Sequence, residues 1–182
     1  MKEDQGSPFV MNSGDCVLQP PHIRHQVLEC SDGLEVIEVS CPAEHETYTD
    51  HLLELPKSKT DPSRNFSGQR FLFFQGNKTD WEKHPSEGFF RDTGIGSATR
   101  GIAEVRVLRP DKKNLINRSH QGELLFYFVL KGSTELNLED HGSSPLSEGD
   151  SASIPPGLNY SFGKVSENTE ILEVHMPMLN SP

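Results

Sequence analysis

Short apolar stretches recur along the whole chain, separated by Gly and Pro residues, and most have the length of one β-strand. Several alternate apolar and polar residues, as 35–39 and 134–139 do, which is the period of a strand with one buried face. The pattern predicts strands at 34–40, 69–75, 101–108, 123–130, 133–139 and 169–176. Residues 47–55 are the one segment typical of a helix, with Thr47 or Thr49 as its N-cap. The chain is therefore predicted to be all-β.

A segment near the start of the chain returns near its end. GDCVLQPPHIRH at 14–25 aligns with GDSASIPPGLNY at 149–160, an offset of 135 residues that continues without a gap to Pro42 and Pro177. Each copy predicts a Gly-Asp turn, a short strand, a stiff Pro-Pro corner and a further strand. We infer that the chain holds the closing half of one β unit twice.

The repeated segment resembles the second motif of the cupins, G-x5-P-x-G-x2-H. In the later copy Gly149, Pro155 and Gly157 fit this motif, with Tyr160 in the place of the histidine. The earlier copy fits it with three residues and has one replacement. Gly14, Pro20 and His25 match, and His22 replaces the second glycine.

The first cupin motif, G-x5-H-x-H-x3–4-E-x6-G, resembles residues 116–132. With Gly132 as the anchor, Arg118 and His120 take the two histidine positions and Leu125 takes the glutamate position. The resemblance covers most of the chain outside roughly residues 43–90. It implies a double-stranded β-helix, or jelly-roll barrel, and a protein similar to the bicupins.

The resemblance implies one complete barrel plus the closing half of a second. We expect the half barrel at 1–42, a linker with a short helix and barrel-covering loops at 43–90, and the complete barrel at 91–182. The same offset would place the opening motif of the first barrel about fifteen residues before Met1. A late gene start, a fragment or completion by another subunit would each explain this, and we favour a truncated bicupin. Because a half barrel leaves strand edges open, we also expect a homo-oligomer, most simply a dimer.

Cupin metal centres use three histidines and one glutamate, a donor set that suits Fe, Mn, Ni, Cu or Zn. The second barrel retains only His120 of these four, so we expect no metal there. His25 holds a ligand position in the first barrel, where we expect a divalent metal in a full-length form. An ordinary hydrogen-bonded histidine is the alternative at both positions.

Other polar and aromatic residues are candidates for a ligand pocket. The mouth of the first barrel would be lined by His22 and Arg24, and the second lumen would contain Arg118, Tyr127 and Tyr160. Glu123, two residues before Leu125, is a further candidate for the second lumen.

The resemblance leaves three classes of function open. The first is a metal-dependent, dioxygenase-like enzyme acting on a small organic acid or a diketone-like substrate. The others are a binding protein for a small molecule and a purely structural module.

The amino-acid composition limits the classes of partner that this protein is expected to bind. The chain has 17 Lys+Arg against 27 Asp+Glu, a net charge of −10, and no basic patch, which argues against nucleic acid and anionic membrane surfaces. No segment approaches the roughly 18 apolar residues of a membrane span, and the N-terminus lacks the apolar core of a signal peptide. Three cysteines without CxxC spacing are typical of reduced thiols. We therefore predict a cytoplasmic protein with a small-molecule ligand.

Overall fold

The computed structural model describes residues 1–4, 6–52, 54–55, 61, 63–86, 88–111 and 117–178. The first part of the chain contains the strands β1 (Lys2–Glu3), β2 (Cys16–Leu18), β3 (His25–Gln26) and β4 (Leu72–Phe74). The second part contains β5 (Glu82–His84), β6 (Gly88–Asp92), β7 (Glu104–Pro110), β8 (Leu124–Lys131), β9 (Ser133–Leu138), β10 (Gly142–Ser147), β11 (Ser151–Ser153), β12 (Tyr160–Gly163) and β13 (Glu170–Met176). Helical turns are η1 (Gly76–Lys78) and α1 (Ile95–Ala98). The predicted all-β class is confirmed.

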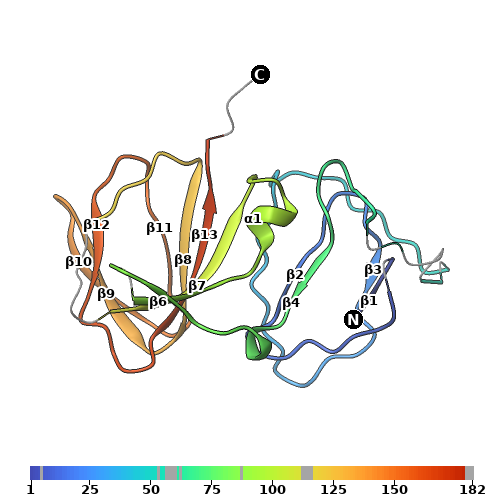
Figure 1. Ribbon diagram of the computed structural model, residues 1–182, viewed down its shortest axis with the longest axis horizontal. Helices are drawn as coiled ribbons and strands as arrows, with labels where there is room; N and C mark the ends of the chain where they lie inside the picture. The colour runs from blue at the N-terminus through green and yellow to red at the C-terminus, as the bar shows by residue number, and fades with distance from the viewer. Residues whose placement is uncertain are drawn as a thin grey trace.

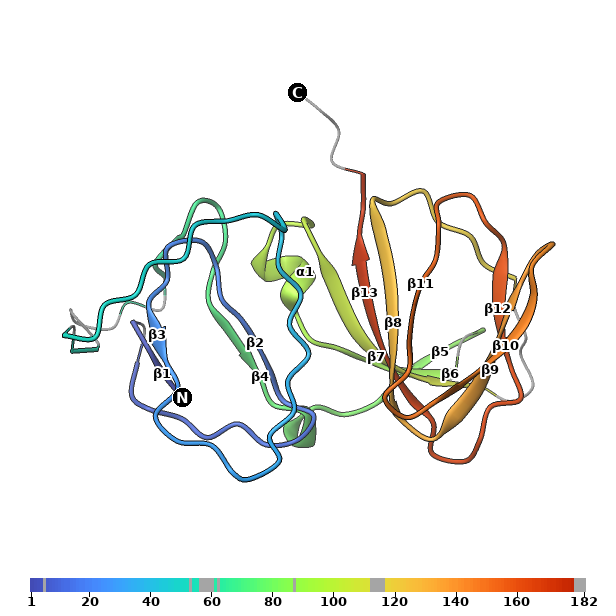
Figure 2. The same cartoon turned by 180° about the vertical axis from the view of Figure 1, so that it is seen from behind.

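The strands form two units, which lie side by side in Figure 1. In the first unit, β1 pairs with β3 and β2 pairs with β4. In the second unit, a six-stranded sheet has the order β11-β8-β13-β7-β6-β5, and a three-stranded sheet has the order β10-β9-β12. The view from behind shows α1 between the two units (Figure 2).

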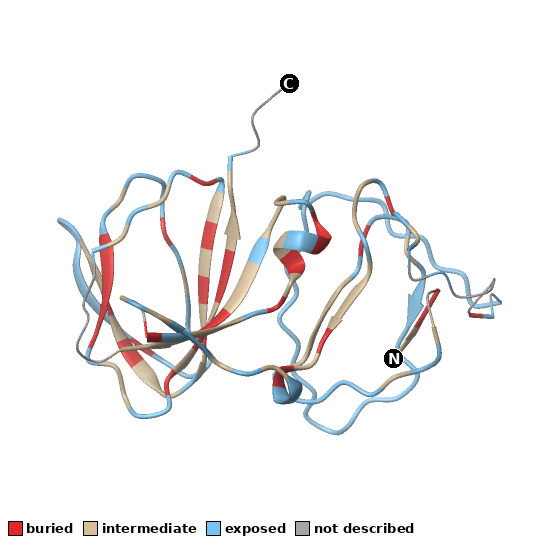
Figure 3. Cartoon of the chain, in the orientation of Figure 1, coloured by how far each residue is buried: buried red, intermediate tan, exposed pale blue. Residues whose placement is uncertain are grey.

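Both sheets of the second unit contribute to one hydrophobic core. Alternate residues of β8 are buried, as the sequence pattern requires for a strand with one inner face. The core consists of Leu108, Leu125, Tyr127, Val129, Leu136, Leu146, Ile154, Tyr160, Phe162 and Ile171. Buried positions concentrate in the second unit, whereas most of the first unit is exposed (Figure 3). The second unit therefore has the two packed β layers of a jelly roll.

Two predicted elements are wrong. Residues 34–40 are not a strand in the structure, since they form no hydrogen-bonded ladder with any described strand. The described part of 47–55 contains no helix, and Leu53 lies outside the described residues. Tyr48 and Leu52 are 83% and 94% exposed, so a helix there would have no apolar face packed against the protein to stabilise it.

The turns of the two repeat copies have the same hydrogen bonds. Asp15 Oδ2 accepts from the Asn12 amide at 2.9 Å, and Asp150 Oδ2 accepts from the Ser147 amide at 2.8 Å. The Asp15 amide donates in turn to Asn12 O at 3.0 Å, and the Asp150 amide donates to Ser147 O at 2.9 Å. The predicted correspondence of the two turns is confirmed.

The strand register repeats with the same offset. Glu3 of β1 pairs with His25 of β3, and Leu138 of β9 pairs with Tyr160 of β12. β2 corresponds in full to β11, since each is the short strand that follows the Gly-Asp turn. The copies therefore share local geometry and one strand pairing.

The copies differ in their other neighbours. β11 pairs with β8, which precedes it in the chain, whereas β2 pairs with β4, which follows it. β5 lies before residue 91 and β6 begins before it, and both strands belong to the same sheet as β7. Among the described residues, no helix is long and apolar enough to cross a membrane.

Candidate functional site

Two residues at cupin motif positions lie next to each other at the end of the three-stranded sheet. Arg118 and Tyr160 form an isolated antiparallel bridge. The amide of each donates to the carbonyl oxygen of the other, at 2.8 Å in both directions. Because Tyr160 begins β12, the bridge fixes the segment around residue 118 against the second unit.

A row of polar side chains crosses the inner face of the six-stranded sheet. Strand register places Glu173 of β13 opposite both Arg106 of β7 and Tyr127 of β8. Glu173 Oε1 accepts from Arg106 Nε at 2.9 Å and from Nη2 at 2.5 Å. Glu173 Oε2 accepts from the Tyr127 hydroxyl at 2.8 Å. The carboxylate is therefore held between two strands.

This row meets the Arg118–Tyr160 bridge. The Tyr127 and Tyr160 hydroxyl oxygens are 2.7 Å apart, and Arg118 Nη1 lies 3.9 Å from Glu173 Oε2. We name the five residues the inner polar cluster: Arg106, Arg118, Tyr127, Tyr160 and Glu173. Two guanidinium groups face one carboxylate, so the inner polar cluster carries one positive charge in excess.

Burial keeps the two phenols neutral. Tyr127 and Tyr160 are 1% and 4% exposed. Burial, followed by the charge of Glu173, raises the pKa of Tyr127 far above its ordinary value. Burial also raises the pKa of Tyr160, although the hydrogen bond with Tyr127 and the charge of Arg118 act in the opposite direction. Both groups are hydrogen-bonding hydroxyls at neutral pH.

Arg118 is the arginine of the inner polar cluster with the looser contact to Glu173, although its side chain is less exposed than the 30% of Arg106. Its ion pair with Glu173 is longer than that of Arg106, which makes direct hydrogen bonds to the same carboxylate. The Arg118 side chain is 17% exposed, against 6% for Glu173. A solvent-borne anion could therefore contact Arg118 while Arg106 continues to balance Glu173.

His120 is engaged with the backbone and does not join the inner polar cluster. Its Nε2 lies 2.7 Å from Ile154 O, and its Nδ1 accepts from the Gly122 amide at 3.2 Å. These bonds assign the proton to Nε2. Nε2 then carries the proton, and a metal at Nδ1 would have to displace the Gly122 amide.

The donor set at the four motif positions does not fit a metal ion. Arg118 is a cation, Leu125 is a buried hydrocarbon, and both nitrogens of His120 are engaged. Tyr160 remains, with a pKa raised by burial. In the part of the chain that the structure describes, no three His, Cys, Asp or Glu side chains are grouped to hold a metal.

The candidates of the first unit lie apart from the inner polar cluster. His22, Arg24 and His25 are all exposed, and His25 stands in β3 opposite the buried Glu3. His25 occupies the position that corresponds to Tyr160. Metal binding by His25 stays a prediction.

Sequence reasoning missed two residues of the inner polar cluster, and two of its candidates in the second unit, His120 and Glu123, lie outside the cluster. Glu123 is exposed at the residue before β8. Arg106 and Glu173 were not among the candidates. Glu173 has the same parity as the buried Ile171 in β13, so both side chains lie on the same face, and this parity is the signal that could have identified it.

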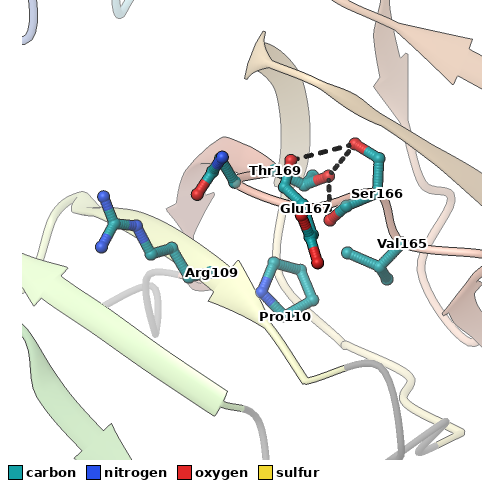
Figure 4. A pocket seen from close by; sticks show the side chains of 7 residues that line it. Arg109, Pro110, Val165, Ser166, Glu167 and Thr169 are labelled. Atoms are coloured by element: carbon teal, nitrogen blue, oxygen red, sulfur yellow. Dashed lines mark hydrogen bonds between the residues drawn. The ribbon is translucent and has the colours of Figure 1, made fainter.

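A pocket of about 180 Å³ lies elsewhere in the second unit (Figure 4). It is lined by Arg109, Pro110 and residues 165–169, the segment between β12 and β13. The Ser166 and Thr169 hydroxyls are 2.8 Å apart at its edge. None of the residues of the inner polar cluster lines it.

Comparison with protein families gives one match. Residues 105–175 match the family described as "Cupin domain". The match supports the cupin superfamily. It spans β7 to β13 and therefore includes the whole inner polar cluster. No curated protein matches the chain.

Solved structures with cupin-type folds are similar to parts of the chain. KdgF from Halomonas sp. is 16% identical, with a TM-score of 0.47, and the match covers 58% of this chain and 94% of that one. Streptomyces PAC13 with uridine is 13% identical, with a TM-score of 0.46, covering 59% and 83%. An RmlC-like cupin from Shewanella frigidimarina is 18% identical, with a TM-score of 0.46, covering 57% and 89%. Nothing about activity follows from likenesses at this level.

Proposed function

We propose that the second unit is a cupin-type binding module for a small anionic molecule and works without a metal. The observation that carries this proposal is the ion pair of the buried Glu173 with Arg118, whose backbone forms the β-bridge with Tyr160. These residues place a guanidinium group and a phenol where a metal-binding cupin would place histidines. Arg118 is the anchor for the ligand.

The chemistry of the inner polar cluster favours an anion such as a small carboxylate. A guanidinium group binds a carboxylate through two parallel hydrogen bonds. Removal from water strengthens this interaction, since the effective dielectric constant inside a protein is lower. The excess positive charge of the inner polar cluster disappears when one anion binds. Arg106 and Tyr127 hold the Glu173 carboxylate in place when the anion binds to Arg118.

A metal-dependent, oxygenase-like activity is the second candidate, and it concerns the first unit. The observation that favours it is the position of His25, which matches Tyr160 in the shared strand register. We infer that the two units descend from one repeated barrel, with the closing half at 1–42 and the second barrel at 91–182. In that scheme His25 is a ligand of a divalent metal, and His22 and Arg24 line the entrance.

A thermal-unfolding experiment tests the binding proposal with defined probes. Acetate, pyruvate and benzoate are added to the full chain at constant ionic strength. A carboxylate present at ten times its Kd stabilises the folded state by about 1.4 kcal/mol. This corresponds to a rise in Tm of roughly 3–6 °C for a chain of this size. Arg118→Gln should abolish the rise.

The matched control is Arg70→Gln, which removes an exposed arginine outside the inner polar cluster. This variant should keep the full carboxylate effect. An equal rise in Tm for the wild type and Arg118→Gln would contradict the proposal, as would no rise with any of the three probes.

A further inference from the structure

Residues 34–40 have the sequence of a strand but form no hydrogen-bonded ladder with any described strand. We name them the unpaired segment. Leu34, Val36, Ile37 and Val39 are 56%, 73%, 38% and 42% exposed. Single exposed apolar residues are ordinary, but four within six residues of high β propensity mark a contact site.

The repeat shows what covers such a segment. The counterpart of the unpaired segment lies mainly in β13, which is hydrogen-bonded to β7 on one edge and to β8 on the other. Ile171 and Val174, which correspond to Val36 and Val39, are only 0% and 4% exposed. The natural cover of this sequence is therefore an antiparallel strand.

The charges of β13 specify the covering strand further. Glu170 forms an ion pair with Arg109 at 2.6 Å, and Glu173 forms one with Arg106 at 2.5 Å. Both arginines belong to β7 and are three residues apart. One pair lies on each face of the sheet, since residues three apart in a strand point to opposite faces.

The unpaired segment keeps the glutamates but has no such arginines. Glu35 and Glu38 correspond to Glu170 and Glu173, and both are exposed. Glu38 Oε1 accepts a hydrogen bond from Ser40 Oγ at 3.4 Å. Among the described residues, neither Glu35 nor Glu38 has an arginine or lysine within ion-pair distance.

We propose that the unpaired segment is a docking edge for an extended segment of another polypeptide, one that carries two arginines three residues apart among apolar residues. The partner strand runs antiparallel, with its first arginine opposite Glu38 and its second opposite Glu35. The apolar residues between the arginines cover Val36 and Ile37, as Leu108 and Val107 cover Ile171 and Leu172.

A second copy of this chain is a poorer occupant. The unpaired segment contains two glutamates and no basic residue, so pairing with itself would bring like charges together across the ladder. The β7 strand of a second copy is already held between β6 and β13. Charge complementarity therefore favours a basic partner strand.

A peptide with the sequence of residues 101–110, GIAEVRVLRP, is the probe. Binding of the fluorescently labelled peptide to the full chain is followed by fluorescence anisotropy. A second peptide, with Arg106→Glu and Arg109→Glu, should bind at least about tenfold more weakly, because two ion pairs become two repulsions. The Glu35→Lys/Glu38→Lys protein should reverse this preference.

Val36→Pro is the control for the site of binding. Proline removes an amide donor and blocks a ladder, and Val36 forms no ladder in the unbound protein, so the fold is unaffected. This variant should lose peptide binding. Unchanged binding to Val36→Pro would show that the peptide replaces β7 in the second unit, and would overturn the proposal.

Two further outcomes would overturn the proposal that the unpaired segment is a docking edge. One is equal binding, or none, of the two peptides to the wild type. The other is self-association of the wild type in sedimentation velocity that Val36→Pro abolishes, which would assign the edge to a second copy. The small-ligand proposal is independent, since no residue of the inner polar cluster lies in the unpaired segment.

Discussion

His22 and Gly157 occupy the same position in the two repeat copies, and both have positive φ. The values are 64° for His22 and 78° for Gly157. The left-handed region costs a residue with a Cβ atom roughly 1–2 kcal/mol, and glycine avoids this cost. Gly157, which fits the cupin motif, therefore adopts this conformation without strain. His22 adopts it with backbone strain.

Exchanging these residues should change stability in opposite directions. Gly157→Ala should destabilise the protein by about 1 kcal/mol from backbone strain alone, since the nearest atom to an added Cβ is Gln121 Nε2 at 3.9 Å. His22→Gly should be neutral or stabilising by up to about 1 kcal/mol. Urea unfolding monitored by circular dichroism measures both changes. A destabilising His22→Gly change would contradict this assignment of strain.

At the scale of elements, the two Gly-Asp turns are alike locally but differ in what they join. Within the described part of the chain, the Asp150 carboxylate accepts a hydrogen bond only from the Ser147 amide, whereas the Asp15 carboxylate also accepts one from the Gly76 amide at 2.9 Å. This second bond spans 61 residues and joins the turn before β2 to η1. The first unit therefore uses its turn to hold a distant segment of chain.

Substituting each aspartate in turn should distinguish the local hydrogen bond of the turn from the long-range bond to η1. Asp150→Ala should cost about 1 kcal/mol for one hydrogen bond, and Asp15→Ala about 2 kcal/mol for two. Hydrogen exchange gives the specific measurement, because Asp15→Ala should speed exchange of the Gly76 amide and Asp150→Ala should not. Equal exchange of that amide in both variants would show that the Asp15 bond does not hold η1.

At the scale of the whole molecule, the buried phenols of the second unit make stability depend on alkaline pH. The folded-state pKa values of Tyr127 and Tyr160 lie above the ordinary value of 10.0. Above pH 10 the unfolded chain releases both protons while the folded protein retains them. Their contribution is therefore complete below pH 10 and is lost as the pH rises.

Stability should fall by about 1.4 kcal/mol per pH unit for each of these tyrosines above pH 10. The ultraviolet absorbance of phenolate measures ionisation, and circular dichroism measures unfolding. Tyr48 is exposed and should ionise without unfolding, although its hydrogen bond with Glu46 raises its pKa as well. Tyr127, whose pKa is raised far more, should ionise only together with unfolding, and ionisation of all three tyrosines before any loss of structure would contradict the prediction.

The candidate site could be predicted only in part. Tyr127 and Tyr160 were expected in one lumen with Arg118, because Arg118 and Tyr160 occupy motif positions and Tyr127 belongs to the aromatic run of the strand predicted at 123–130. Glu173 and Arg106 were missed, since they are 67 residues apart and only the pairing of β7 with β13 brings them together.

The prediction of a strand at 34–40 was wrong for a related reason. Its residues have the alternation and β propensity of a strand, and the repeat matches it to β13. A strand is stable only beside another strand, and a segment's own sequence does not contain its partner.

The amino-acid sequence by itself determined the all-β class, the 135-residue repeat and the geometry of its turns. These features depend on backbone dihedrals and on hydrogen bonds between residues a few positions apart. Only the tertiary structure decided that β4 pairs with β2, that Arg118 and Tyr160 meet Glu173, and that 34–40 stays exposed. Each of these depends on contacts between segments far apart in the chain, and the same local pattern is compatible with several such contacts.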